Sequence, residues 1–162
     1  MDPVLKACAQ LFSVNETLFD RAVGGLSDGE LRRMPAGEAN PMLWIAGHVA
    51  AYRTLLAAMV GAGSPVAWAP LFAQKSQPSD DAAYPTVAEI QQTLRETGTK
   101  LRARFEQTTE ADLAAPAPRS FPIDDKTMRG AVLFLAYHES YHAGQMAYVR
   151  KCLGYPGIVD GQ

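Results

Sequence analysis

Two histidines near the end of the chain are the residues whose type and spacing most clearly predict chemistry. Residues 138–142 read HESYH, an HExxH motif. On a helix, His138 and His142 project from the same face and can reach one metal ion. In metalloproteases with this motif the glutamate, here Glu139, polarises the attacking water. The motif therefore predicts a metal site that contains both imidazoles.

The third metal ligand must come from elsewhere in the chain. A further histidine six residues beyond His142 would fall at Tyr148, and no glutamate follows Glu139. The remaining histidine is His48, on the apolar stripe of an expected helix, where a lone histidine is usually a hydrogen-bonded core residue. Pairing with the later motif favours a ligand instead. Three neutral imidazoles leave coordination positions open, as in catalytic sites.

Three more residues are candidates for contacting a substrate or orienting a ligand. Gln145 follows His142 by three positions, on nearly the same helical face, and can hydrogen-bond a bound molecule or simply lie at the edge of the apolar stripe. Tyr141 lies within the motif. Asn15 interrupts the apolar stripe of the first expected helix, and we favour a core amide with local partners over a group that points at a site.

Four amphipathic helices are expected to position these residues. Apolar side chains recur at spacings of three and four over 3–23, 41–60, 86–106 and 127–153. The expected cap residues are Asn40, Thr86 and Thr127. A short helical turn is expected after Ser27, and residues 113–126 read as an irregular connection.

The connection 61–85 is too long for a tight turn between antiparallel helices. Fully extended it can span about 80 Å, enough to run back along a helix of about 30 Å. It is therefore a crossover or a lid. The pattern predicts an all-α fold, a four-helix bundle in which the second and third helices lie parallel.

Composition excludes several classes of protein. With 162 residues, a single domain over 1–162 is expected. The net charge of −2 lacks the basic excess of nucleic-acid-binding proteins, so nucleic acid is not an expected partner. The two cysteines, Cys8 and Cys152, have no paired spacing and fit a reduced, cytoplasmic setting. No apolar run approaches the roughly 20 residues needed to span a membrane.

His48 in the setting LWIAGH, together with HESYHAGQ at 138–145, resembles the DinB/YfiT-like superfamily of metalloenzymes. The resemblance covers nearly the whole chain. It implies an up-down-down-up four-helix bundle and a site for zinc, nickel or iron at His48, His138 and His142. It also implies a homodimer that acts on a small molecule.

Characterised branches of this superfamily are transferases and isomerases that use a low-molecular-weight thiol, such as mycothiol or bacillithiol. By analogy, the metal would bind the thiol and Glu139 would orient a ligand or accept a proton. A second hypothesis is a hydrolase in which Glu139 is the base that activates a metal-bound water. A third is a non-catalytic, stress-associated bundle whose coordination sphere has no exchangeable water.

Overall fold

Four long helices form the body of the computed structural model, which describes residues 1–35, 40–73, 75–76, 78 and 83–159. They are α1 (Pro3–Val23), α3 (Met42–Met59), α4 (Val87–Gln107) and α6 (Met128–Cys152). Short helices α2 (Asp28–Arg32) and α5 (Glu110–Ala114) and the 3₁₀ turn η1 (Ala69–Phe72) lie in the connections. The described residues form no β-strand. The expected all-α fold is confirmed.

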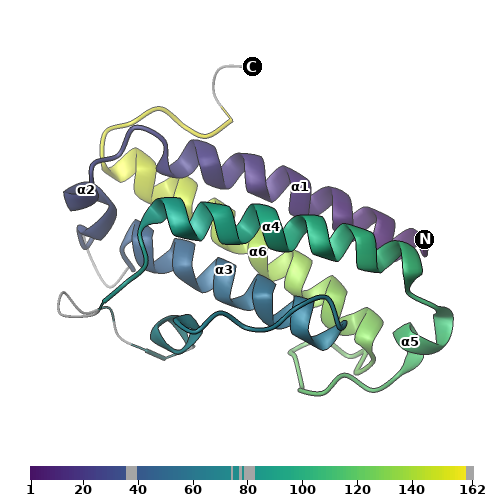
Figure 1. Ribbon diagram of the computed structural model, residues 1–162. Helices are drawn as coiled ribbons and strands as arrows, with labels where there is room; N and C mark the ends of the chain where they lie inside the picture. The colour runs from purple at the N-terminus through teal and green to yellow at the C-terminus, as the bar shows by residue number, and fades with distance from the viewer. Residues whose placement is uncertain (36–39, 74, 77, 79–82, 160–162) are drawn as a thin grey trace.

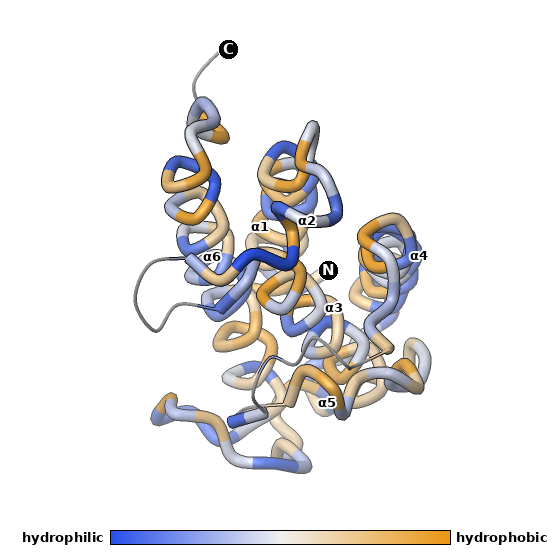
Figure 2. The backbone as a smooth tube through the Cα atoms, turned by 90° about the vertical axis from the view of Figure 1, so that its left-hand side faces the viewer, coloured by the Kyte–Doolittle hydropathy of each residue, from blue (hydrophilic) through white to orange (hydrophobic). Residues whose placement is uncertain are grey.

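The helices run up, down, down and up, as predicted (Figure 1). Viewed end-on, α1 and α3 occupy opposite corners of the bundle, and α4 and α6 occupy the other two (Figure 2). Because α3 and α4 are parallel, the connection between them must return along the bundle. The crossover interpretation of this connection is therefore confirmed, although residues 74, 77 and 79–82 lie outside the described part.

Local signals explain most helix ends. The side chains of Ser27, Thr86 and Thr109 each form a capping box at the start of α2, α4 and α5. Asp2, which the sequence interpretation overlooked, accepts hydrogen bonds from the first turn of α1. The prediction that Asn40 caps α3 is wrong by one position: the N-cap is Pro41, which has no side chain able to accept a hydrogen bond.

Helix α3 is the central helix of the bundle. By length and composition Met42–Met59 could cross a membrane, but 78% of this window is buried inside the protein. That burial is expected of the core helix of a globular bundle. The sequence interpretation did not recognise that Met42–Met59 is long and apolar enough to span a membrane.

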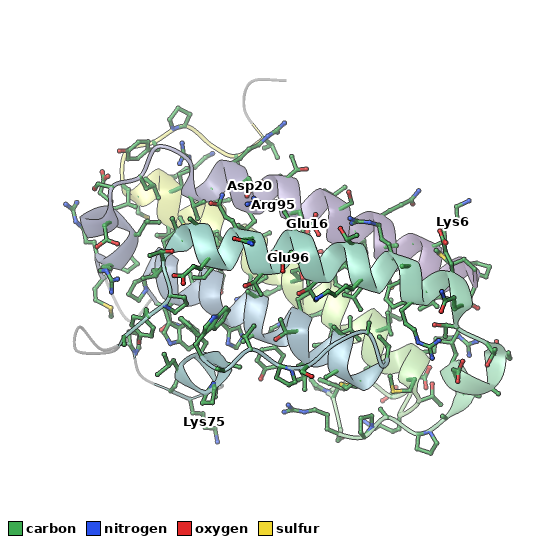
Figure 3. All side chains as sticks on the ribbon, in the orientation of Figure 1. Lys6, Glu16, Asp20, Lys75, Arg95 and Glu96 are labelled. Atoms are coloured by element: carbon green, nitrogen blue, oxygen red, sulfur yellow. The ribbon has the colours of Figure 1, made fainter. Side chains whose placement is uncertain are left out.

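The apolar core consists of two clusters on either side of a polar layer at mid-length. One cluster includes Phe19, Ile45 and Met146, and the other includes Phe12, Leu56 and Phe105. The buried polar residues of this layer, and of the helix turns beside it, are Asn15, His48, Arg53, Thr54, Thr97 and Glu139. On the α1 side, Glu16 and Asp20 lie along the seam with α4, where Asp20 pairs with Arg95 at 3.7 Å (Figure 3). All four long helices thus contribute to the buried polar layer, and α3 and α6 supply His48, Arg53 and Glu139.

Candidate metal centre

The three histidines predicted to form one site come together between α3 and α6. The Nε2 atom of His138 lies 3.2 Å from Nε2 of His48 and 3.1 Å from Nε2 of His142. All three candidate ligand atoms lie within 4.8 Å of one another. Three nitrogen atoms bonded to one tetrahedral ion at 2.0–2.1 Å would be roughly 3.3 Å apart. The three imidazoles can therefore hold a divalent metal ion with little movement.

The hydrogen bonds at the outer ring nitrogens decide which way the lone pairs point. Nδ1 of His48 lies 2.7 Å from the carbonyl oxygen of Phe72, and Nδ1 of His142 lies 2.7 Å from Oε1 of Gln145. Both partners are acceptors, so both Nδ1 atoms carry a proton and both Nε2 atoms present lone pairs to His138. A single N–H on His138 can satisfy only one of them. A cation between the three Nε2 atoms would accept a lone pair from each of them. The convergence of these nitrogens is therefore the observation that best fits a metal.

Burial keeps the imidazoles neutral, as metal ligands must be. Loss of solvation, together with the neighbouring His142 and His48, lowers the pKa of His138 to about 3. The same burial, together with His48, lowers the pKa of His142 to about 4, although its bond to Gln145 opposes the shift. Burial also lowers the pKa of His48, against the opposing effect of the Phe72 carbonyl. Protons therefore compete weakly for these nitrogens at neutral pH.

Aromatic rings hold the imidazoles in place. Trp44 stacks on His48 with ring centroids 5.0 Å apart and an interplanar angle of 17°. Tyr52 contacts both His48 and His138, at centroid distances of 4.6 and 4.7 Å. These packed rings restrict the rotamers of the ligands, so the site is preorganised.

The site opens into a cleft of about 360 Å³. We call this the histidine cleft. Its lining comes from α3, α6, both irregular connections and the residue two positions before α3: Asn40, Trp44, His48, Tyr52, Lys75, Arg119, Ser120, Phe121, Pro122, Phe134, His138, Tyr141, His142 and Gln145. The volume is within the usual range for small-molecule sites. Of the residues predicted from the sequence, the three histidines, Gln145 and Tyr141 are therefore together at one cleft, and Tyr141 accepts a hydrogen bond of 3.1 Å from Gln145.

Glu139 does not line the histidine cleft and bonds Arg53 of α3 instead. Glu139 is only 5% exposed. Its carboxylate accepts hydrogen bonds from Nε of Arg53 at 2.9 Å and from Nη2 of Arg53. Burial raises the pKa of Glu139, and the charge of Arg53 opposes this. The carboxylate is thus fully engaged in a buried ion pair, and its role as a proton acceptor stays a prediction.

Asn15 lies in the interface between α1 and α6. Its Nδ2 donates to Oγ of Ser140 at 3.0 Å, and it also hydrogen-bonds the Glu139 side chain. It is therefore part of the buried polar layer, whereas the histidine cleft is lined by other residues.

Two groups of the site were missed by sequence reasoning. The Phe72 carbonyl orients His48. Every residue has a backbone carbonyl, so the sequence does not show which one will accept this hydrogen bond. Arg53 is 2% exposed and also bonds Glu16 and the carbonyls of Phe12 and Leu94. An arginine within an otherwise apolar helix was the signal that could have revealed it.

The comparisons with known proteins agree with this architecture. A solved structure from Enterococcus faecalis, described as a conserved protein, matches with a TM-score of 0.68 and 16% sequence identity. The match covers 95% of this chain and 99% of that chain, and at this identity it shows the fold alone. The comparison with curated proteins gives no match.

A model of the DinB superfamily matches residues 11–146. That range contains His48, His138 and His142 and most of the four-helix bundle. The resemblance inferred from the two histidine-bearing segments is confirmed. The chain belongs to the DinB superfamily.

Proposed function

We propose that this protein is a metal-dependent enzyme in which His48, His138 and His142 hold one divalent transition metal, zinc above nickel or iron. The observation that supports it best is the convergence of three Nε2 atoms, two of them forced to present lone pairs, on the wall of an open cleft. An ion held by the three histidines would be accessible to water or a substrate from the cleft. A purely structural site would have its remaining coordination positions closed by protein.

Within this class, we favour transfer of a low-molecular-weight thiol to an electrophile. A bound divalent cation supplies positive charge that lowers the pKa of a thiol, so no separate protein base is required. This suits a site whose only nearby carboxylate, among the described residues, is the ion-paired Glu139. Gln145 and Tyr141 would orient the thiol through hydrogen bonds at the cleft wall. The thiol itself is an inference from the family.

The hydrolase hypothesis requires a rearrangement of a buried ion pair. It needs Glu139 to leave Arg53 and reach the cleft, and a buried charge that loses its partner costs about 3–5 kcal/mol. The geometry therefore favours the transferase, with the hydrolase as the alternative. The non-catalytic bundle is disfavoured because the site opens into a cleft.

Metal content provides the test. Wild type, His48→Ala and Glu139→Gln should be produced without an affinity tag, reconstituted with zinc, and measured for bound metal and secondary structure. Wild type and Glu139→Gln should each hold about one ion per chain, while His48→Ala should lose at least tenfold in affinity because one ligand is gone. Retention of wild-type affinity by His48→Ala would refute the site.

The same proteins separate the two reactions. With zinc bound, wild type and Glu139→Gln should both consume a small thiol in the presence of an electrophile. Ester or amide hydrolysis that disappears in folded, zinc-loaded Glu139→Gln would instead support the hydrolase.

A further inference from the structure

A second hollow lies along α3 and shares two lining residues with the histidine cleft. This hollow, which we call the apolar groove, has a volume of about 550 Å³. It is lined by α3 residues that include Leu55 and by residues 65–73 of the crossover connection, among them Val66 and Phe72. Every lining residue is apolar except Tyr52 and Arg119, and these two also line the histidine cleft. The two hollows therefore meet at Tyr52 and Arg119.

The junction carries positive charge. The lining of the histidine cleft contains two cationic side chains, Arg119 and Lys75, and no aspartate or glutamate among the described residues. Lys75 is exposed, and its side chain points away from the bundle (Figure 3). Arg119 is the better placed of the two because it borders both hollows. Its guanidinium lies over the Phe121 ring at 5.5 Å, and no ion pair joins it to a described residue.

A protein with a net charge of −2 has thus placed two cationic side chains, and no carboxylate from the described residues, around one cleft. Such a lining recognises an anion with oxygen acceptors.

We propose that one substrate of this enzyme is an organic acid with an apolar body. Its carboxylate binds Arg119 at the junction, and its apolar part lies in the apolar groove against Leu55 and Val66. The histidines line the cleft on the other side of Tyr52. The statement that this acid is a substrate rests on the proposed function, in which the histidine site is the reacting centre. The binding itself needs no metal.

Calorimetry on metal-free protein tests the substrate class without interference from carboxylates that bind the metal. The probes are butanoate, hexanoate and octanoate, with octylammonium and octanol for comparison. Each two-carbon extension of the acid should tighten binding by about tenfold, since apolar burial grows with every methylene. Octylammonium should bind at least tenfold more weakly than octanoate because Arg119 repels it.

Variants locate the two parts of the site. Arg119→Gln should weaken octanoate by about tenfold and leave octanol unchanged. Arg33→Gln makes the same charge change at an exposed position outside both hollows and should change neither. Leu55→Ala should weaken octanoate and octanol alike. Equal octanoate affinity in wild type and Arg119→Gln, or no dependence on chain length, would overturn the proposal.

Metal content, measured separately, keeps the two proposals apart. If the histidines bind zinc but octanoate fails these tests, the substrate class is wrong and the metal site stands. If octanoate binds as expected but His48→Ala leaves zinc affinity unchanged, the cleft binds organic acids and the proposed metal centre is wrong.

Discussion

Arg53 is the residue on which the buried charges of the bundle depend. It donates hydrogen bonds to Glu16 and Glu139 and to two backbone carbonyls, and it is 2% exposed. Removing one member of such a network is costly because the remaining charges stay buried. The HExxH motif alone would identify Glu139 as a base. In the structure, its carboxylate instead forms an ion pair with Arg53 on α3. A motif specifies residue types, whereas the role of each residue follows from the groups that it contacts.

The histidine cluster makes the stability of the metal-free protein depend on pH. Unfolded histidine has a pKa near 6.5, whereas folding lowers the pKa of His138 to about 3 and of His142 to about 4. Between these values the unfolded chain binds more protons than the folded one. The stability that neutral imidazoles contribute is therefore complete above about pH 6.5 and is lost as pH falls toward 4.

Denaturant unfolding with a chelator present, at pH 7.5, 6.5 and 5.5, measures this dependence. The free energy of unfolding of wild type should fall with pH over this range, and His138→Asn should show a shallower fall because one titrating group is gone. Parallel curves for the two proteins would show that His138 titrates normally in the folded state.

At the scale of the elements, Gly47 lets the crossover connection pack closely against α3. A Cβ atom at this position would lie 2.3 Å from ring atoms of Phe72, whose side chain is fully buried. The absence of a side chain thus lets Phe72 pack on α3 beside His48. This close approach brings the Phe72 carbonyl within hydrogen-bonding distance of His48.

Gly47→Ala should push Phe72 outward. We expect a loss of about 1–2 kcal/mol in the free energy of unfolding, because overpacking outweighs the gain in helix propensity. Zinc affinity should fall by about tenfold as His48 loses its orienting carbonyl. Denaturant unfolding and zinc titration measure the two effects.

Gly144→Ala is the matched control, since nothing lies within 4 Å of the added Cβ in α6. It should gain up to about 1 kcal/mol in stability and keep its zinc affinity. If both variants bind zinc like wild type, the packing of Phe72 does not orient the ligand.

Helix positions were largely predictable because local rules determine them. The periodicity of apolar residues located all four long helices, and Ser27 and Thr86 cap where expected. Helix α5 was missed although Thr109 and Asp112 carry a capping signal, and its last residues were assigned to the irregular connection that starts at Leu113. The three histidines of the cluster could be found because histidine is scarce. The contacts of Arg53 and Phe72 could not, since they depend on how distant segments pack.

At the scale of the whole molecule, α6 presents an apolar stripe to solvent. Leu133, Tyr137, Tyr141 and Tyr148 are 44%, 62%, 54% and 66% exposed. At about 100° per residue they fall within an arc of roughly 80° on the helix. Exposed aromatic stripes of this kind are typical of protein interfaces. We propose that a second copy of the chain covers this stripe, in line with the homodimer expected from the family.

Sedimentation velocity tests this assembly. Wild type should be a dimer at micromolar concentration, and Tyr148→Glu should raise the dissociation constant at least tenfold because it places a charge in the interface. Val14→Glu, on the exposed side of α1, should leave the dimer intact. A monomeric wild type would show that the stripe has another purpose.

Phe72 also belongs to the apolar groove, while its carbonyl holds a candidate metal ligand. We expect a molecule that fills the groove to limit the movement of the segment around Phe72, and so to favour the orientation of His48. Thermodynamic linkage then makes the two bindings cooperative, with each ligand raising the affinity of the other by the same factor. We therefore expect zinc to bind more tightly in the presence of octanoate than in its absence.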